Sequence, residues 1–96
     1  MDLGKTIKRL RKQRNFTQKF FSSKCQITQT YLSQIENNLK DPNLGTLKKI
    51  GEALEVPLPI VFYLSLNEED VPYEKRKAFE MVNPPIKSLI NEFFAV

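Results

Sequence analysis

The chain has no histidine and no tryptophan, and it has a single cysteine and only three glycines among its 96 residues. Without histidine or a second cysteine, it lacks the ligands that most often bind zinc and the usual base that activates a serine or cysteine nucleophile. It also has no glycine-rich phosphate loop and no nucleophile with an evident base beside it. We therefore expect a protein that is not an enzyme and that uses no cofactor and no metal.

Long apolar runs are also missing, since none approaches the roughly 20 residues that span a bilayer. Residues 1–5 lack the basic and apolar regions of a secretory signal. Cys25 cannot form an intrachain disulfide, and we interpret it as a small buried hydrophobic residue. A hydrophobic fraction of 41% over this length predicts one globular domain, or one small domain with an appendage. The single cysteine and the lack of a signal agree with a location in the cytoplasm.

Positive charge is concentrated at the N-terminus. The chain has a net charge of +4, yet residues 1–24 hold eight basic side chains and a single acidic one, and the remainder is net negative. Such a local field attracts polyanions, including nucleic acids. A solvated basic helix face would give the same count, and a basic amphipathic helix can also lie on a membrane. The membrane interpretation is the weaker one, because the apolar stripe of residues 3–14 is narrow and contains no Trp or Phe.

Apolar periodicity predicts five helices in the first two thirds of the chain. The first covers residues 3–14, the second residues 18–24 and the third residues 28–37. Thr17, Thr28 and Asn43 are the expected N-caps of the second, third and fourth helices, and a fifth helix begins near Val56. Gly51 inside the fourth helix indicates a close helix contact. The stripes expected to face the core contain Leu3, Ile7 and Leu10 in the first helix, Leu32, Ile35 and Leu39 in the third, and Leu44, Leu47, Ile50 and Leu54 in the fourth.

The stretch from Thr17 to Glu36 predicts two short helices that meet across a tight turn. One face of the second helix is apolar, whereas the other carries Thr30, Ser33, Gln34 and Asn37. A solvated face usually carries Lys and Glu. Uncharged polar side chains instead indicate hydrogen bonding to a partner with patterned donors and acceptors, as the base edges in a DNA major groove provide.

The last thirty residues predict a helical extension. A charged helix from Tyr73 to about Val82 is expected to turn Ala78, Phe79 and Val82 inward, and Asn83-Pro-Pro is expected to break it. The final segment has an apolar stripe, which either folds back on the fifth helix or pairs with a second subunit. That stripe contains Ile86, Leu89, Ile90, Phe93 and Phe94.

Together these features resemble the lambda-repressor-like (Cro/C1, or XRE-type) helix-turn-helix DNA-binding domains. The resemblance covers about residues 3–66 and implies an all-α, five-helix domain in residues 1–66. It does not cover residues 67–96, where the sequence pattern predicts one or two further helices. The matching segments are Leu3-Gly-x-x-Ile7-Lys-x-Leu-Arg11, Thr17-Gln18, Thr28-Gln-x-Tyr-Leu32-Ser-Gln-Ile35-Glu36-Asn37, Pro42-Asn-Leu44-x-Thr46-Leu47 and Ile50-x-x-Ala53-Leu-x-Val56.

In that family the third helix lies in the major groove and the second crosses the DNA backbone. The resemblance implies that Arg11 and Glu36 form a partly buried salt bridge. It also places Gln26 where the family usually has glycine, at a cost on the order of 1 kcal/mol if the backbone there is left-handed. The implied base-reading residues are Gln29, Thr30, Ser33 and Gln34, and the implied contacts to the DNA backbone are Thr17, Gln18, Tyr31, Asn37 and Lys40.

Two functions fit these observations. The first is a bacterial or phage-type transcriptional regulator that binds double-stranded DNA sequence-specifically, acting as a repressor and as a homodimer on a palindromic operator, with the C-terminal stripe as the dimer element. The alternative is an antitoxin or anti-regulator whose C-terminal helices bind a partner protein, with DNA binding reserved for autoregulation.

Overall fold

The computed structural model describes all 96 residues and contains helices but no strands. Two short 3-10 helices, η1 and η2, precede the last helix. None of the helices combines the length and apolar character that crossing a bilayer requires. The all-α fold and the five helices predicted before residue 67 are confirmed. The elements are α1 (Leu3–Gln13), α2 (Gln18–Lys24), α3 (Gln29–Glu36), α4 (Leu44–Leu54), α5 (Leu58–Leu64), η1 (Glu68–Asp70), η2 (Tyr73–Lys75) and α6 (Arg76–Phe94).

The helix starts follow the predicted capping residues. The side chains of Thr17, Thr28 and Asn43 accept hydrogen bonds from the backbone N–H groups three residues further on, at 3.1, 3.0 and 2.8 Å. Each cap satisfies an amide that the first helical turn leaves without a partner. The starts of α2, α3 and α4 are therefore fixed by local chemistry that the sequence displays directly.

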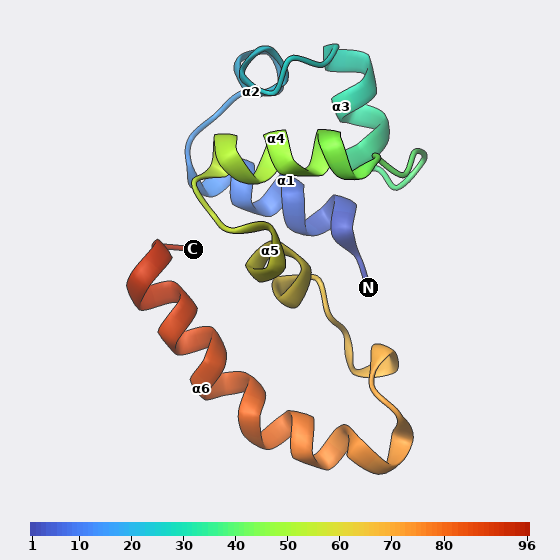
Figure 1. The fold of residues 1–96 in the computed structure, drawn as a ribbon, viewed down its shortest axis with the longest axis vertical. Helices are drawn as coiled ribbons and strands as arrows, with labels where there is room; N and C mark the ends of the chain where they lie inside the picture. Colours follow the sequence, from blue (N-terminus) through green and yellow to red (C-terminus); the bar gives the residue numbers. More distant parts are fainter.

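Helices α1 to α5 enclose one apolar core. In Figure 1, α4 crosses in front of α1, α2 and α3 lie above them, and α5 lies below. Cys25 is fully buried in this core, as predicted, and burial raises the pKa of its thiol to about 11. The buried cluster consists of Ile7, Leu10, Phe21, Cys25, Leu32, Ile35, Leu47, Ile50, Ala53, Leu54, Val56 and Val61.

Two residues assigned to the core stripes are exposed instead. Leu39 follows the end of α3 at Glu36, so the helical spacing that linked it to Ile35 does not continue to it. Leu44 is the first residue of α4 and lies at the surface, where that helix begins. Both residues lie at or beyond a helix end, where the helical spacing of apolar residues no longer predicts which side chains face the core.

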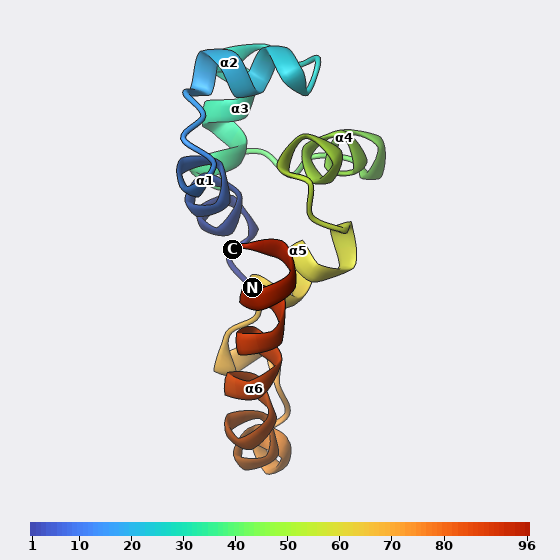
Figure 2. The ribbon, with the colours of Figure 1, turned by 90° about the vertical axis from the view of Figure 1, so that its left-hand side faces the viewer.

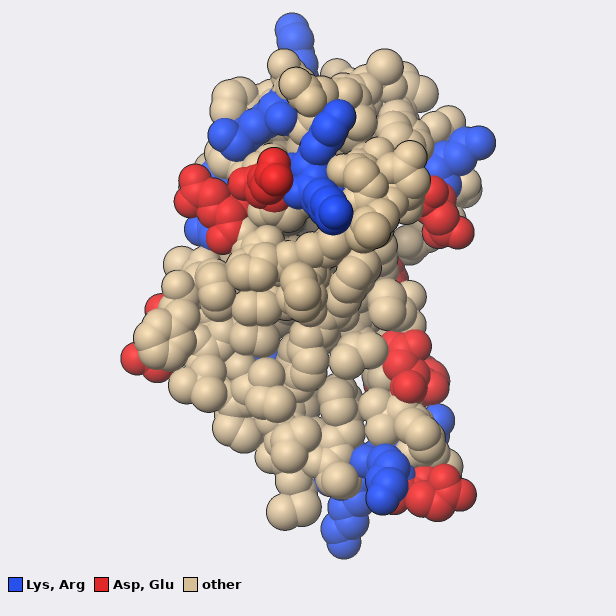
Figure 3. Space-filling view, in the orientation of Figure 1, with Lys and Arg blue, Asp and Glu red and all other residues tan.

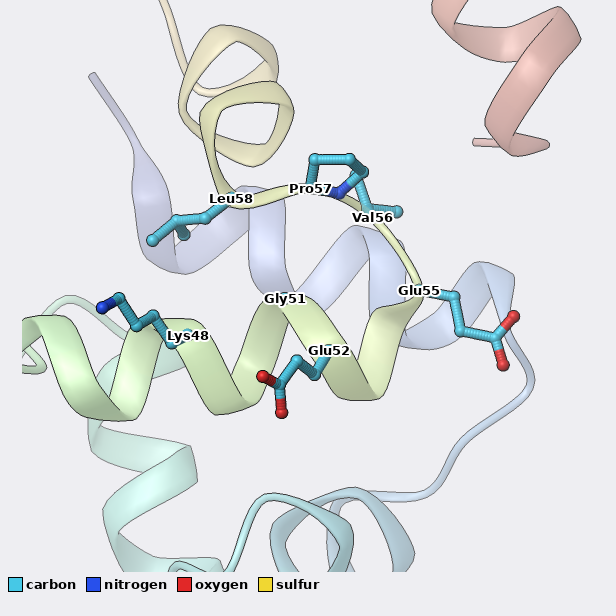
Figure 4. Close-up of a pocket in the computed structure, with 7 residues that line it drawn as sticks. All are labelled: Lys48, Gly51, Glu52, Glu55, Val56, Pro57 and Leu58. Carbon is cyan, nitrogen blue, oxygen red and sulfur yellow. The ribbon is translucent and has the colours of Figure 1, made fainter.

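Gly51 makes a close contact, but with the chain that follows α4 rather than with a neighbouring helix. A Cβ atom at this position would lie 3.1 Å from the carbonyl oxygen of Val56. Figure 4 shows the connection from Glu55 to Leu58 passing over Gly51. The resulting hollow, of about 350 Å³, has Lys48, Glu52 and Glu55 around it but no set of side chains that converges on a ligand.

Five residues adopt the left-handed backbone conformation, and none of them is a glycine. Gln26 is one of them, with φ of 59°, so the backbone of the α2–α3 turn is left-handed at the position where the family usually has glycine. The turn is nevertheless closed by hydrogen bonds from the N–H of Gln26 to the oxygen of Ser23 and from the N–H of Ile27 to that of Ser22, each 3.0 Å long. The other left-handed residues are Asn15, Asn38, Glu55 and Ala95.

Replacing Gln26 by glycine should therefore stabilise the protein. We expect Gln26→Gly to raise the free energy of unfolding by about 1 kcal/mol, because glycine adopts a positive φ without steric cost. The measurement is equilibrium denaturation. As a control, Lys49→Gly in the exposed interior of α4 should lower the same quantity by about 1 kcal/mol. Destabilisation by both changes would show that Gln26 carries no strain.

The predicted break at Pro84 and Pro85 is wrong, because α6 runs through both residues without interruption. A proline has no N–H to donate, so the carbonyl groups four residues earlier, of Glu80 and Met81, lose their helical partners. Both residues are exposed, so water can bind these carbonyls. The helix changes direction along its length, as Figure 1 shows, which is the usual response to proline inside a helix.

The C-terminal segment contacts the five-helix domain through two hydrogen bonds and through apolar packing. The hydroxyl of Tyr63 in α5 donates to Oδ1 of Asn83 at 2.8 Å, and Arg14 donates from Nη2 to the carbonyl oxygen of Phe94 at 3.0 Å. Val96 packs against the buried cluster. In both ribbon views α6 occupies the end of the molecule opposite α2 and α3 (Figures 1 and 2).

The apolar positions of α6 are divided between inside and outside. Ile90 is buried and Phe94 is half-buried, whereas Ile86, Leu89 and Phe93 are exposed. Upstream, the expected inward set is largely wrong. Phe79 is half-buried, but Ala78 and Val82 are exposed, since the uninterrupted helix presents them on a different side from Ile90. The stripe is thus buried along the edge that contains Ile90 and uncovered along the edge that contains Leu89 and Phe93.

Candidate nucleic-acid interface

The outward face of α3 is polar and carries no charge. Gln29 and Thr30 are exposed, and Ser33 and Gln34 are half-buried. Together with Gln18 from the start of α2, these four side chains line one shallow hollow of about 350 Å³. The structure therefore brings the four predicted base-reading residues together on one surface and sets one predicted backbone contact beside them.

The opposite face of α3 is anchored by apolar packing and by one buried ion pair. Glu36 accepts from Arg11 of α1 twice, from Nε to Oε2 at 2.7 Å and from Nη2 to Oε1 at 3.0 Å. Their side chains are 1% and 7% exposed. The third nitrogen of the guanidinium, Nη1, donates to the carbonyl oxygen of Phe16 at 2.7 Å. The predicted pair is thus present as a two-pronged contact, a geometry that fixes direction as well as distance.

Gln18 joins this network, a role that sequence reasoning missed. Its Nε2 donates to Oε1 of Glu36 at 3.0 Å, which ties the first residue of α2 to the last residue of α3. A primary amide has two N–H groups, so one remains for a ligand. Gln18 can therefore position α3 and still donate a hydrogen bond to a phosphate.

A second junction between α1 and α3 depends on Gly4. A Cβ atom there would overlap the carbonyl oxygen of Ile35 and the side-chain oxygen of Asn38. The N–H of Gly4 donates to that oxygen of Asn38 at 3.0 Å, and Nδ2 of Asn38 donates to Oδ1 of Asp2 at 2.8 Å. Hydrogen bonds from the Asn38 side chain and from the Lys5 backbone lower the pKa of Asp2. The glycine in the first matching segment was the only sequence signal of this contact.

The predicted contacts to the DNA backbone lie at the two ends of the polar face. Thr17 uses its oxygen as the cap of α2 but keeps its hydroxyl hydrogen for donation. Asn37 donates from Nδ2 to the carbonyl oxygen of Ser33 at 2.9 Å, and Lys40 is exposed in the connection after α3. Tyr31 differs from the others, because it is half-buried and packs against the core.

Breaking the buried ion pair from one side should destabilise the fold. We expect Glu36→Ala to lower the free energy of unfolding by about 3 kcal/mol, since it leaves the Arg11 guanidinium buried without a counter-charge. The measurement is denaturant unfolding. Glu52→Ala, which removes an exposed carboxylate of α4, is the matched control and should cost about 0.5 kcal/mol or less.

Replacing both partners by apolar residues separates an unpaired charge from lost packing. The double variant Arg11→Met/Glu36→Leu should lose less stability than Glu36→Ala alone, because no charge is left buried. A Glu36→Ala protein as stable as the Glu52→Ala control would contradict the role assigned to the pair.

The comparison with known proteins agrees with this geometry. A model of the helix-turn-helix family matches residues 7–61, from α1 into α5. The chain is 29% identical over 79 residues to the immunity repressor protein of Bacillus phage phi105, and that match covers 80% of this chain and 55% of the repressor. It is 32% identical over 92 residues to the HTH-type transcriptional regulator ImmR of Bacillus subtilis, covering 96% of this chain and 68% of ImmR.

A third relative is the HTH-type transcriptional regulator SinR of Bacillus licheniformis, 32% identical over 69 residues, which cover 71% of this chain and 59% of SinR. The present chain thus spans little more than half of the phage repressor and of SinR. It belongs to the helix-turn-helix family, a family of DNA-binding transcription regulators. The predicted resemblance to lambda-repressor-like domains is confirmed. The similarity to ImmR covers nearly the whole chain and therefore extends into α6.

Proposed function

We propose that this protein is a transcriptional regulator that binds double-stranded DNA sequence-specifically through α3, and that it acts as a repressor. The observation that carries the proposal is the uncharged polar face of α3, held rigidly by Arg11 and Gly4 and placed beside the start of α2. The proposal is supported by the names of its relatives, an immunity repressor and two transcriptional regulators.

The side chains of this face match the chemistry of base edges. A glutamine carboxamide can donate to N7 of adenine and accept from its N6 amino group, so Gln29 and Gln34 suit adenine. The methyl group of Thr30 suits the methyl group of thymine, and the Ser33 hydroxyl can donate or accept. Because α3 is fixed to α1 at two junctions, it can present these groups without rearrangement, which avoids an ordering cost on binding.

The flanking residues would set the register of the helix in the groove. The hydroxyl of Thr17 and the free N–H of Gln18 can donate to phosphate oxygens at one end of the face, and Lys40 and Asn37 can do so at the other. Such contacts position a protein on the duplex but carry no sequence information. Discrimination between sequences therefore depends on the α3 face.

Removing the two glutamine side chains should abolish discrimination. We expect Gln29→Ala/Gln34→Ala to lose most of the preference for a specific duplex over a random one, because each paired contact to a base contributes about 1–3 kcal/mol. Affinities for both duplexes, measured by fluorescence anisotropy, test this. The melting temperature should stay near wild type, since neither side chain is fully buried.

The matched control is Gln13→Ala/Asn91→Ala, which removes two exposed amides away from α3 and should keep the preference. If the preference survives in the variant that lacks Gln29 and Gln34, the assignment of base reading to α3 is wrong.

We further propose that the protein acts as a homodimer. Helix α3 has eight residues and is about 12 Å long, so one copy can read only a few base pairs. Dimers of such domains bind two half-sites about one helical turn apart. Two copies related by a two-fold axis would thus read a palindromic operator.

The uncovered edge of α6 is the proposed pairing surface. Val82, Ile86, Leu89 and Phe93 are spaced by four, three and four residues, the repeat of a coiled-coil seam. We call these four residues the α6 seam. Leu89 is 54% exposed and Phe93 73% exposed. Figure 3 shows that the surface over α5 and the C-terminal half of α6 carries few charged side chains, so a second helix could approach without desolvating ions.

Charges placed on the α6 seam should separate the subunits. We expect Leu89→Glu/Phe93→Glu to be a monomer by sedimentation equilibrium at concentrations where the wild type is a dimer, because two like-charged seams would repel each other. The control Ser88→Glu/Asn91→Glu changes the charge equally at exposed α6 positions outside the seam and should remain dimeric. A dimer in both variants would exclude the seam.

Selection of bound duplexes from a random pool completes this test. The wild type should select inverted half-sites with centres roughly 34 Å apart. A single asymmetric site would contradict the homodimer. A wild-type monomer that forms a stoichiometric complex with another protein through α6 would instead favour an antitoxin or anti-regulator.

A further inference from the structure

Six basic side chains lie on α1 or at its end, and the structure uses only two of them. Arg11 is buried against Glu36, and Arg14 donates to the carbonyl oxygens of Leu54 and Phe94 at 3.0 Å each. The other four point outward and are exposed. None of these four takes part in an ion pair, since the ion pairs of the molecule are Arg11–Glu36 and that of the N-terminal amine with Asp70. The four are Lys5, Lys8, Arg9 and Lys12.

These four residues form a single stripe along the helix. Their spacing of three, one and three residues puts them on one face, and with Gln13 they line a hollow of about 590 Å³. From Lys5 to Lys12 the stripe is about 10 Å long, a length over which a DNA duplex carries about six phosphate charges. We call these four side chains the α1 basic stripe. The nearest acid along the chain, Asp2, is occupied by hydrogen bonds from Asn38 and from the Lys5 backbone.

The stripe borders the junction that holds the reading helix. Gly4 and Arg11 are the α1 residues that contact α3. Lys8 lies midway between them along the helix and about 40° to 60° around its axis from either one. This rotation leads away from the core side of α1, where Leu10 is buried. Figure 2 shows α1 and the N-terminal end of α2 on one side of the molecule and α4 on the other.

We infer that the α1 basic stripe is a second DNA-contacting surface, which binds backbone phosphates of the duplex beyond the bases that α3 reads. The inference rests on the proposed function, because its ligand is the same duplex. A duplex seated on α3 and the start of α2 continues past the outer side of α1, where four unpaired cations meet it. Phosphate contacts of this kind add affinity that depends on salt and not on sequence.

The alternative occupant of such a stripe is an acidic protein surface. The duplex is favoured because the stripe adjoins the α1–α3 junction. The start of α2, which borders the polar face of α3, lies on the same side of the molecule as α1. A surface reserved for a separate protein partner would have no reason to adjoin the reading helix.

The test compares two variants of equal charge. The first replaces the stripe by glutamine, as Lys5→Gln/Lys8→Gln/Arg9→Gln/Lys12→Gln. The second removes four exposed cations from α4 and α6, as Lys48→Gln/Lys49→Gln/Lys77→Gln/Lys87→Gln. Either change lowers the net charge of +4 to zero. Glutamine has nearly the same helix propensity as lysine and arginine, so melting temperatures should stay close to that of the wild type and show that both variants fold.

The measured quantity is the slope of log affinity against log salt, for a random-sequence duplex and for the duplex selected by the wild type. Each phosphate contact contributes a slope of about 0.9, so loss of the stripe should reduce the slope by about 3 to 4. Between about 50 and about 200 mM salt, the loss of affinity should then be smaller by roughly 100-fold. The ratio of specific to random affinity should remain as in the wild type, and the control variant should keep the wild-type slope.

Equal slopes in the stripe variant and the control variant would overturn the inference and leave the stripe to an acidic protein partner. In that case the proposed function would still stand, because discrimination by Gln29 and Gln34 is measured separately. A wild-type protein that selects no duplex from the random pool and does not bind the random-sequence duplex would overturn both.

Discussion

The contact between Arg11 and Glu36 is the interaction on which the position of the polar face of α3 depends. It is the point where three helices meet, because Gln18 of α2 also bonds Glu36. The ion pair is almost completely buried, and every buried polar side-chain atom of the molecule has a hydrogen-bond partner. A buried pair of charges does little for stability in comparison with an apolar core, but it is strongly directional. Here it fixes the rotation of α3 about its own axis and hence the face that α3 presents.

The second constraint is the close approach of α1 and α3 at Gly4. A side chain at this position would overlap the end of α3. The ion pair and this contact hold the C-terminal part of α3 at two separate points, so the helix can neither rotate nor slide along α1. Apolar packing of Leu32 and Ile35 holds the inner face of this short helix, and the two junctions add a fixed direction to that packing.

The outer surface of the molecule has three regions of different chemistry. Uncharged groups that can distinguish bases lie on α3, and cations that can bind phosphate without regard to sequence lie on the outer side of α1. At the far end of the molecule, α6 buries one edge of its apolar stripe and leaves the α6 seam open. The proposed reading, grip and pairing would thus occupy separate elements around one small core, so that each could change without rebuilding the others.

The helices of the first 66 residues and their caps were predictable from the sequence, because capping residues and apolar periodicity act locally. Thr17, Thr28 and Asn43 begin their helices where the sequence placed them, and the left-handed turn at Gln26 was expected from a missing glycine. The four candidate base-reading residues were expected to share one face of α3, and the structure places them together.

What the sequence did not reveal has both local and long-range causes. Local rules predicted a break at Pro84 and Pro85, yet α6 continues through them, and the residues whose carbonyls lose a helical partner are exposed. Leu39 and Leu44 were assigned to the core but lie outside the part of their helices that faces it. The bond from Gln18 to Glu36 and the exposure of one edge of the α6 stripe follow from how helices pack across 18 and more residues of chain. The sequence by itself determined the first five helices and the side chains that they carry, because caps and periodicity act locally. Only the tertiary structure decided which helix faces remain free to bind, because that depends on how the helices pack.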